Sequence, residues 1–487
     1  MNPTAAPDLP ASLEWINTDH PISLRTLEGR TVLLYFGTFA CSNCTRLVPE
    51  LRRLKEGHPG LVIIEVHAPE FESPATVESF PEAVRHARVD HPVAIDHDQR
   101  LWQAFGVRSW PTFALIDPAG NLIGKTTGEG LSQRLDLKLD RLAEEFERRG
   151  MPDTRPIHLT TTPAAARVGA LYHPAKIAAD RVGMRLFIGD RGHHQVVVAG
   201  SDGKILETIG TGAPGNADGS FSRASLYLPE GLAFDGEADT LYVADTGNHM
   251  IRRISWPDRR VETIAGTGLE APSSMAGGPG MDVALNAPRD LALMGGYLYI
   301  TMAGANQIWR MDLDTHKIEP HAGSGREGLA DGPLGVATFA GPSGIVTDGE
   351  VLYVADSGAS AIRRIKRGMV ETLIGRSLED FGDLDTIASM ARIHHPMGIA
   401  SHQGLLYIAD TYNHKIKELD PRTGWVLTKT GSGIRGYRNG MSGDARLSEP
   451  GDLVNLGGLW YIADTGNNAV RVYDPDRHMV STLMLWE

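Results

Sequence analysis

Cys41 and Cys44 are the only two cysteines in the chain, and their spacing suits reversible disulfide chemistry. They follow the apolar run 32–36 and precede leucines spaced as on one face of a helix at 47–54. A cysteine that opens a helix meets unpaired backbone N–H groups and the positive end of the helix dipole, which lower its pKa from about 8.5 to roughly 3.5–7.5. The motif therefore predicts a reactive thiolate at Cys41 and a redox-active pair with Cys44.

Three other interpretations of the cysteine pair compete with redox chemistry. A structural zinc site needs four ligands, and the sequence has no second CxxC motif. A peroxide-reducing cysteine would explain Thr38-x-x-Cys41, but the proline that such sites carry four residues before the threonine is Leu34 here. The third alternative is a decayed or merely structural pair. We expect no metal and no cofactor beyond the Cys41–Cys44 disulfide or dithiol itself.

Alternating strands and helices position the motif within the first 150 residues. The β-branched and aromatic run before the motif indicates a strand, so the motif lies in a strand-to-helix turn. A hairpin turn is expected at Asp117–Asn121. Further strands are predicted at 61–66, 93–95, 113–116 and 122–125, and helices at 77–87, 99–105 and 131–149. This order indicates a mixed α/β domain.

The segment Trp110-Pro111-Thr112 precedes the hairpin, and together with the CxxC motif after the first long strand it resembles the thioredoxin fold. The resemblance implies that the Trp110–Pro111 peptide bond is cis and that Pro111 lies against the disulfide. A cis bond turns the chain sharply and exposes a backbone edge with which a substrate strand can pair. Trp110, Pro111 and Thr112 are therefore the expected substrate groove.

The sequence departs from thioredoxins at two positions next to the motif. Thioredoxins carry a buried aspartate six residues before the first cysteine and a tryptophan just before it, whereas this chain has Tyr35 and Ala40. The usual base for proton transfer is therefore missing. His67 and Glu70, at the end of the second strand and in the following turn, are the candidates to replace it. Solvated loop side chains are the alternative interpretation of both.

Length and composition predict two folded units. The 487 residues are 41% hydrophobic and 22% charged, enough to bury more than one core. We expect a thioredoxin-like domain at 1–150 and a linker at 151–170, because the latter contains prolines and polar residues without helical periodicity. Alternation at 157–159 would let the linker contribute an edge strand. The second domain is expected at 171–487.

The second domain is made of six sequence repeats. Each begins with a proline-centred strand, and these prolines recur 54 to 59 residues apart, at Pro174, Pro229, Pro288, Pro342, Pro396 and Pro450. A strand of the type Leu-Tyr-Val-Ala-Asp follows in most repeats, and two more strands complete each one. Four short strands repeated six times predict an all-β six-bladed propeller. The Tyr-[Val/Ile]-Ala-Asp-[Thr/Ser]-x-Asn core resembles NHL repeats.

A carboxylate and a basic residue recur together in the repeats. In four blades the aspartate that ends the second strand has a basic residue seven positions later; the pairs are Asp245 and Arg252, Asp356 and Arg363, Asp410 and Lys417, and Asp464 and Arg471. Blade three has lost both partners and carries Met302 and Trp309. This joint loss favours structural ion pairs over a ring of metal-binding or catalytic carboxylates. Turn glycines are expected to supply positive φ at Gly247, Gly358 and Gly466.

Long glycine-rich loops connect the blades, and their length favours a binding face over simple connections. They span 212–222, 268–282, 325–335 and 433–443. A protein client or partner is the expected ligand there. Recurring loop dipeptides are interpreted as tight turns at Asp218-Gly219, Asp331-Gly332 and Asn439-Gly440. The histidine pairs 193–194 and 394–395 lack acidic neighbours at a recognisable metal spacing, so no metal site is predicted there.

The net charge of −13 argues against a nucleic-acid partner, because phosphate binding depends on clustered Lys and Arg. The start of the sequence shows no basic region followed by an apolar stretch, and no run of about 18 apolar residues occurs later. We therefore expect a cytoplasmic protein without a membrane partner. In that reducing compartment a lone CxxC motif serves as a dithiol reductant or sensor. The oligomeric state stays open.

The combination of a thioredoxin-like domain and a six-bladed NHL propeller resembles the family of NHL repeat-containing protein 2 and its bacterial relatives. Residues 66–71 and 110–112 add to this resemblance, which extends over nearly the whole chain. The first functional hypothesis is a thiol-disulfide oxidoreductase whose propeller recruits a client. The second is an interaction scaffold with an inert thioredoxin-like unit. A propeller-borne hydrolase or lyase ranks last, because the repeats show no metal or acid–base cluster.

Overall fold

The computed structural model describes residues 4–18, 20–37, 42–68, 84, 89–108, 110–127, 131–148, 170–271 and 276–486. The chain divides into two compact units, Met1–Val168 and Gly169–Glu487. The predicted linker at 151–170 lies outside the described residues except for residue 170, and the predicted helix at 77–87 lies outside them except for Val84.

The first unit contains a seven-stranded sheet in the order β1-β7-β6-β3-β4-β5-β2. Its strands are β1 (Thr4–Ala5), β2 (Glu14–Ile16), β3 (Thr31–Gly37), β4 (Leu61–His67), β5 (Val93–Ile95), β6 (Thr112–Ile116) and β7 (Asn121–Thr127). Its helices are α1 (Ser42–Gly57), α3 (Arg100–Ala104) and α4 (Leu131–Arg148), with a 3-10 turn at Leu24–Leu27. Strand β3 pairs in parallel with β4 and antiparallel with β6. This is the mixed α/β thioredoxin-like sheet that the sequence predicts.

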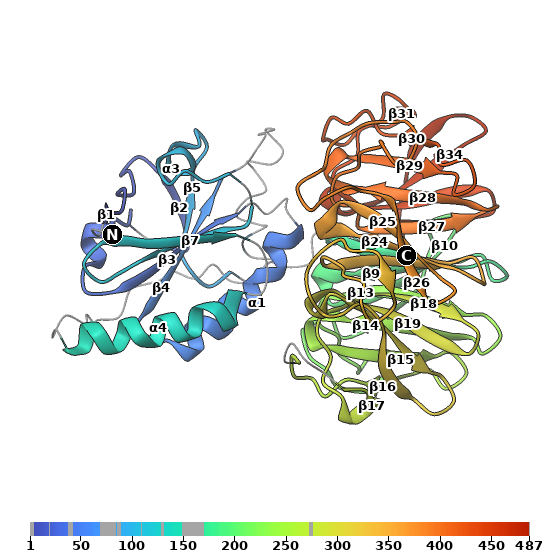
Figure 1. The fold of residues 1–487 in the computed structure, drawn as a ribbon, viewed down its shortest axis with the longest axis horizontal. Coiled ribbons are helices and arrows are strands. Elements are labelled where there is room, and N and C mark those ends of the chain that lie inside the picture. The colour runs from blue at the N-terminus through green and yellow to red at the C-terminus, as the bar shows by residue number, and fades with distance from the viewer. Residues whose placement is uncertain are drawn as a thin grey trace. The chain divides into compact units, whose positions relative to one another are not determined.

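Both faces of the central strands are covered, so β3 and β4 are buried along nearly their whole lengths. Figure 1 shows α1 and α4 together on one face of the sheet. Even-numbered residues such as Leu34 and Ile64 pack against Leu101 of α3. Odd-numbered residues such as Ile63 pack against Leu51 of α1 and against α4. Because side chains alternate along a strand, the odd-numbered residues of β4 lie on the face that α1 covers.

The second unit is a propeller of six antiparallel sheets, as the repeats predict. Blades one to three contain β8 (Pro174–Asp180), β9 (Arg185–Asp190), β10 (Gln195–Gly200) and β11 (Ile205–Ile209); β13 (Pro229–Asp235), β14 (Thr240–Asp245), β15 (Met250–Ser255) and β16 (Arg260–Ala265); and β18 (Pro288–Met294), β19 (Tyr297–Met302), β20 (Gln307–Asp312) and β21 (Lys317–Ala322). Blades four to six contain β23 (Pro342–Thr347), β24 (Leu352–Asp356), β25 (Ala361–Lys366) and β26 (Met369–Ile374); β27 (Gly398–His402), β28 (Leu405–Asp410), β29 (Lys415–Leu419) and β30 (Val426–Thr430); and β32 (Pro450–Leu456), β33 (Leu459–Asp464), β34 (Ala469–Asp474) and β35 (Met479–Leu483).

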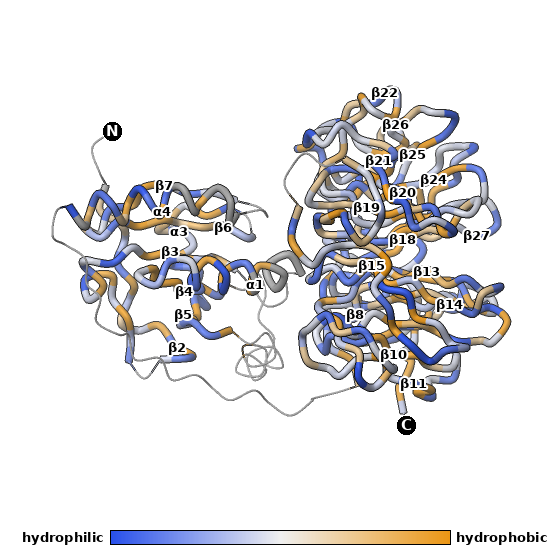
Figure 2. Tube along the Cα trace, turned by 90° about the horizontal axis from the view of Figure 1, so that it is seen from below, coloured by the Kyte–Doolittle hydropathy of each residue, from blue (hydrophilic) through white to orange (hydrophobic). Residues whose placement is uncertain are grey.

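Four blades gain a fifth, two-residue strand from the preceding loop. These are β12 (Gly219–Ser220), β17 (Gly278–Pro279), β22 (Gly332–Pro333) and β31 (Gly440–Met441), and each pairs with the outermost strand of its blade. Hydrophobic and hydrophilic residues are interspersed along the propeller strands in Figure 2, which matches sheets that pack face to face around an axis.

The ring closes by contacts between blade six and blade one. The innermost strands touch in a closed cycle, from β8 through β13, β18, β23, β27 and β32 back to β8. The Tyr461 hydroxyl donates to the carbonyl oxygen of Ser201 (3.2 Å). At the outer edge, the N–H of Ile205 donates to the carbonyl oxygen of Trp486 (2.7 Å). The N–H of Trp486 in turn donates to the carbonyl oxygen of Gly203 (3.0 Å). These contacts replace the covalent loop that joins every other pair of blades.

Six equivalent side chains link neighbouring blades around the ring. Each belongs to the positive-φ residue that ends the turn after the second strand of a blade. Each accepts a hydrogen bond from a backbone N–H of the next blade, and the donor is the residue directly before that blade's repeat proline. The acceptor and donor residues are His194 and Leu228, His249 and Ala287, Asn306 and Gly341, Ser360 and His395, His414 and Glu449, and Asn468 and His173, at 2.8–3.3 Å. The last pair again joins blade six to blade one.

The prediction that turn glycines supply the positive φ is wrong. In blade two the residue with φ of 54° is His249, two positions after Gly247. Gly247 is needed for a different reason, because a Cβ atom there would lie 2.6 Å from the carbonyl oxygen of Tyr227. Gly358 and Gly466 meet the preceding loop in the same way. Close approach of two backbones, rather than φ, therefore selects glycine.

Candidate functional site

The CxxC motif lies between β3 and α1. Strand β3 ends at Gly37 and α1 begins at Ser42, so Cys41 falls within residues 38–41, outside the described residues. Cys44 belongs to the first turn of α1, and its side chain is also outside what the structure describes. Because α1 is the crossover between the parallel strands β3 and β4, it starts at the carboxyl ends of both. The described neighbours of the motif are the residues at the carboxyl ends of these central strands, which are called the motif's edge of the sheet from here on.

The predicted groove residues lie at the same edge. The Trp110–Pro111 peptide bond is cis, as the resemblance implies. Thr112 opens β6 and pairs with Phe36, next to the last residue of β3. The indole N–H of Trp110 donates to the carbonyl oxygen of Ala68 (3.0 Å), which directly follows β4. The fold thus brings this segment beside the two strands from which the motif emerges.

His67 is a buried strand residue rather than a solvated loop residue. It ends β4, is 1% exposed, and pairs with Gly37, the last described residue before the motif. The N–H of Asp96 donates to the His67 carbonyl oxygen (2.8 Å) and fixes its backbone. Of the two predicted proton-transfer residues, His67 is therefore brought to the edge of the motif, whereas Glu70 lies outside the described residues.

The fold gathers three further titratable residues, including Glu65, which lies two positions before His67 on β4, and no sequence motif marks them. Oε2 of Glu65 lies 3.4 Å from Nε2 of His91, and Nδ1 of His91 lies 3.8 Å from Oδ1 of Asp90. Glu65 and His91 are each 2% exposed, whereas the side chain of Asp90 is 41% exposed. The signal available in the sequence is the one carboxylate within the apolar run 61–66.

Charge and burial oppose each other in this group. Burial disfavours a positive charge on His91, but the neighbouring Asp90 and Glu65 outweigh it and raise the pKa of His91. The hydrogen bond to His91 lowers the pKa of Asp90 to about 2 against partial burial, with help from Lys55 and Arg52. The arrangement therefore favours an imidazolium held between two carboxylates.

Tyr35 fills the place where the resemblance would put a buried aspartate. It is 1% exposed, and its ring stacks on Phe113 with centroids 5.1 Å apart. The phenol end of Tyr35 lies over Gly37, because a Cβ atom at that glycine would be 2.8 Å from the Tyr35 hydroxyl. Any carboxylate that serves the motif must therefore come from another strand.

The Asp–basic pairs of the propeller are confirmed as buried ion pairs. Nη1 of Arg252 lies 2.7 Å from Oδ2 of Asp245, and both side chains are fully buried. Asp245 also accepts hydrogen bonds from the amide of Asn248 (2.8 Å) and the N–H of Tyr227 (2.7 Å). Burial raises the pKa of Asp245 to about 6, although Arg252 and these donors act in the opposite direction. Its oxygens are occupied by protein donors, which fits a structural role.

Each pair extends to a residue of the preceding loop. Nη2 of Arg252 donates to Oδ1 of Asp218 (2.9 Å), and the N–H of Thr263 donates to the same oxygen (3.0 Å). Asp218 therefore does more than form the tight turn predicted for it. The equivalent triads are Asp356, Arg363 and Asp331; Asp410, Lys417 and Asp385; and Asp464, Arg471 and Asn439.

Blade three has lost every member of this network together. Met302 and Trp309 replace the aspartate and arginine, as the sequence indicates. Gly277 and Pro320 stand where blade two has its loop aspartate and its threonine, judged by the matching strand register. Met302 and Trp309 are fully buried in an apolar cluster. Blade three has thus exchanged the polar network for an apolar set, whereas blade one keeps Asp190, in contact with His193 and Gln195 (both 2.8 Å), and has Val197 in place of the basic residue.

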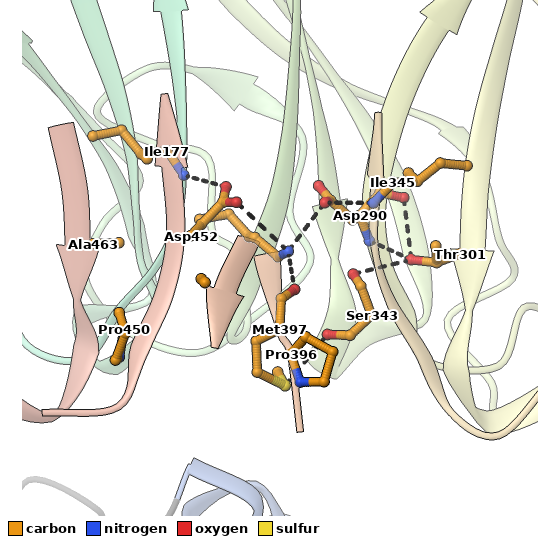
Figure 3. Close-up of polar contacts among 12 residues, drawn as sticks. Ile177, Asp290, Thr301, Ser343, Ile345, Pro396, Met397, Pro450, Asp452 and Ala463 are labelled. Atoms are coloured by element: carbon orange, nitrogen blue, oxygen red, sulfur yellow. Dashed lines mark hydrogen bonds and ion pairs between the residues drawn. The ribbon is translucent and has the colours of Figure 1, made fainter. Parts of the chain in front are cut away.

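A second buried ion cluster joins the innermost strands of the propeller (Figure 3). Nζ of Lys176 lies 3.0 Å from Oδ2 of Asp290 and 4.0 Å from Oδ1 of Asp452. The ammonium group also donates to the carbonyl oxygen of Met397 (2.6 Å). These residues come from blades one, three, six and five, so one lysine spans the ring. No sequence pattern predicts this cluster.

The carboxylates of this axial cluster are tied to neighbouring backbone. The N–H of Ile177 donates to Oδ2 of Asp452 and the N–H of Ile345 donates to Oδ2 of Asp290, both at 3.1 Å (Figure 3). Burial raises the pKa of Asp452 to about 7, against the opposing effect of Lys176. Each carboxylate thus binds one strand of the next blade as well as the shared cation, which indicates a role in holding the ring together.

Metal-binding clusters and membrane-spanning helices are both absent from the described residues. Among them, no group of three or more His, Cys, Asp or Glu side chains is arranged to hold a metal ion. In that same part of the chain, no helix has the length and apolar character needed to cross a membrane.

Known proteins match the chain over its whole length and over its first unit. A family profile described as thioredoxin-like matches residues 29–122. NHL repeat-containing protein 2 of Homo sapiens is 34% identical across 99% of this chain and 72% of that protein. Protein SUPPRESSOR OF QUENCHING 1, chloroplastic, of Arabidopsis thaliana is 33% identical across 99% of this chain and 48% of that protein. Thiol-disulfide oxidoreductase ResA of Halalkalibacterium halodurans is 34% identical across 23% of this chain and 62% of that protein.

Proposed function

Since the chain belongs to the NHL repeat-containing protein 2 family, we propose that it is a thiol-disulfide oxidoreductase whose propeller docks a protein client. The distant relation of its thioredoxin-like unit to thiol-disulfide oxidoreductases supports this reaction class. The observation that carries the proposal is the edge of the sheet from which the motif emerges. There the buried His67 pairs with Gly37, and the segment 110–112 runs beside the same strands.

In the proposed reaction the Cys41 thiolate attacks a disulfide of the client, forms a mixed disulfide and releases one client thiolate. Cys44 then attacks the Cys41 sulfur, which releases the second client thiolate. The client gains two electrons, and the cysteine pair is left oxidised to a disulfide. His67 accepts the proton that the Cys44 thiol loses, with Glu70 as the second candidate for this role. The groove residues Trp110, Pro111 and Thr112 hold the client backbone.

The propeller supplies the client-docking surface in this proposal. The loop between blades four and five exposes large apolar side chains, including Phe381 (52% exposed) and Met390 (55% exposed), and Trp425 beside it is 53% exposed. Grouped apolar side chains of this kind are typical of interaction surfaces. A protein partner fits better than nucleic acid, because the chain carries a net charge of −13. We place the reaction in the cytoplasm, where the reducing thiol pool can restore the dithiol.

The proposal is tested by comparing the full chain with its Cys41→Ser and Cys44→Ser variants in the reduction of insulin disulfides. Cys41→Ser should fall to the uncatalysed rate, and Cys44→Ser should accumulate the mixed disulfide because it can start the reaction but not complete it. The wild-type reduction potential should lie near that of thioredoxin, about −270 mV. Equal activity of wild type and Cys41→Ser, or a pair unable to form a disulfide, would refute the proposal.

A non-catalytic scaffold is the second candidate, and the environment of Tyr35 favours it. Tyr35 stacks on Phe113 where thioredoxins carry their base, so proton transfer depends wholly on replacement groups. If the unit is inert, wild type and both cysteine variants will bind a propeller client equally and none will reduce insulin. That pattern would assign the function to the propeller alone.

A further inference from the structure

We propose that Asp90, His91 and Glu65 form a proton relay between solvent and the face of the sheet beneath α1. The three side chains lie in series, with 3.8 Å between Asp90 Oδ1 and His91 Nδ1 and 3.4 Å between His91 Nε2 and Glu65 Oε2. This inference rests on the proposed thiol-disulfide exchange, in which a proton must leave the resolving cysteine. The three residues act through protonation and charge, so they are positioning residues.

The outer end of the relay reaches solvent. The Asp90 carboxylate is 41% exposed, and it lies 3.9 Å from Arg52 and 4.0 Å from Lys55 of α1. These cations hold it against the helix without burying it. The side-chain amide of Asn17 donates to the carbonyl oxygen of His91 (3.1 Å) and fixes the backbone that carries the imidazole. Protons can therefore enter at Asp90 and meet a fixed, buried imidazole.

The inner end lies on the face that α1 covers. Glu65 is an odd-numbered residue of β4, and Leu61 and Ile63 on the same face pack against α1. A buried carboxylate in an apolar layer is costly unless it is paired, and His91 supplies the paired charge. A pair of titratable groups that persists at this cost beside a reactive motif is a functional candidate.

His67 continues the relay toward the motif. It follows Glu65 on the same face of β4, because residues two apart on a strand project to the same side. Val48 of α1 packs against the β5 residues that pair with Glu65 and His67. Position 44 lies one helical turn before Val48 on the same side of α1. The backbone therefore arranges Glu65, His67 and position 44 in order toward the motif's edge.

The titratable groups around the relay come from three elements. Tyr35 of β3 pairs with Glu65, His67 shares its strand, and Arg52 and Lys55 of α1 face Asp90. Against the cost of burial, the two carboxylates raise the pKa of His91, which supports a charged imidazole as the central carrier. Both ring nitrogens of the imidazolium then carry a proton, one toward Glu65 and one toward Asp90.

In the resolving step the Cys44 sulfur bonds to the Cys41 sulfur while the bond from Cys41 to the client sulfur breaks, and its electron pair leaves with the client thiolate. The Cys44 proton passes through His67 to Glu65. As Glu65 takes up this proton and loses its negative charge, the His91 imidazolium gives its Nδ1 proton to Asp90 and keeps the proton on Nε2. Asp90 releases a proton to water, so charge and protons balance, and the reverse reaction runs the same path inward.

The test measures the acidity of Cys44 in a Cys41→Ser background of the full chain, from the pH dependence of its alkylation by iodoacetamide. Glu65→Gln removes a negative charge and should lower the midpoint by about half a pH unit, which is about threefold more thiolate below the midpoint. His91→Gln removes the compensating positive charge and should raise the midpoint by about as much. Structural damage would not give opposite shifts from the two variants.

Asp96→Asn is the matched control, because Asp96 is a buried carboxyl of the same unit that accepts hydrogen bonds from the N–H groups of Leu101 and Trp102. It should leave the midpoint unchanged. Unchanged midpoints in both relay variants, or shifts of one sign in all three, would overturn the relay. Alkylation needs no client, so opposite shifts in a chain that cannot reduce insulin would refute the proposed function and still support the coupling.

Discussion

Buried carboxylates occur in both units, but their surroundings differ. In the propeller, Asp245 is held by an arginine, an asparagine amide and a backbone N–H at 2.7–2.8 Å. In the thioredoxin-like unit, the ion-pair partner of Glu65 among the described residues is the imidazole of His91 at 3.4 Å. Short, directed donors lock a carboxylate in place, whereas a looser pairing with a titratable imidazole permits proton exchange. In the proposed relay, the partners of Glu65, rather than its burial, distinguish it from the structural Asp245.

The largest expected effect is at the propeller axis. Lys176→Met would leave the Asp290 and Asp452 carboxylates without their shared cation, which should cost on the order of 3–5 kcal/mol in the free energy of unfolding. Urea unfolding followed by hydrogen–deuterium exchange of propeller peptides measures this loss. Lys366→Met, at an exposed position, is the control. A loss no larger than the control's would show that the axial charges do not stabilise the propeller.

The next largest effect is the loss of stability when one partner of a buried ion pair is removed, compared with the loss when both partners are replaced. Arg252→Met should cost about 3 kcal/mol, the lower end of the range for a broken buried pair, because it leaves the single Asp245 carboxylate buried without its cation. Adding Asp245→Met removes the orphaned charge and follows blade three, so the double variant should recover roughly half of that loss. The same unfolding experiment measures both variants. A double variant less stable than the single one would show that the polar set is needed for more than mutual neutralisation.

A smaller effect is expected when the reactive carboxylate is changed. Glu65→Gln should cost about 1 kcal/mol or less, because glutamine keeps the size and hydrogen-bonding capacity of the side chain. The raised pKa of His91 gives the folded unit stability that is present below about pH 6.5 and lost as pH rises through the folded pKa. Glu65→Gln should flatten this decline in urea unfolding of the first unit. The control variant Asp96→Asn should keep this decline of stability with pH. A cost of Glu65→Gln as large as that of Arg252→Met would show that Glu65 is as tightly held as Asp245.

The smallest effect is expected in acid. Because the pKa of Asp90 is held at about 2, its charge stabilises the folded unit above about pH 4, and this stability is lost as pH falls toward 2. Asp90→Asn should therefore lose less stability than wild type between pH 4 and 2, by a small margin because the carboxylate is partly exposed. Thermal unfolding across this range measures the difference, with the exposed Asp98→Asn as control. Parallel curves for wild type and Asp90→Asn would remove the evidence that Asp90 interacts with His91.

Local patterns in the sequence determine most of the architecture. Each repeat encodes a whole blade, so spacing alone predicts six blades, and the Asp245–Arg252 pair is predictable because its members lie seven positions apart on neighbouring strands. Local patterns likewise predict the strand β3 and the helix α1 on either side of the motif, whereas the cis bond before Pro111 was implied by the resemblance to the thioredoxin fold. The features predicted from local patterns depend on contacts within one supersecondary unit, which composition and periodicity encode directly.

Only the tertiary structure decided which distant charges meet. Lys176 and Asp290 lie 114 residues apart, and Asp452 reaches Ile177 across 275 residues, so these contacts exist only once the ring has closed. Glu65 meets His91 because β5 pairs beside β4 in one register. A shift of one residue would turn Glu65 to the opposite face, toward α3. Strand order and register, which no local pattern specifies, therefore decide which buried charges become structural and which remain able to react.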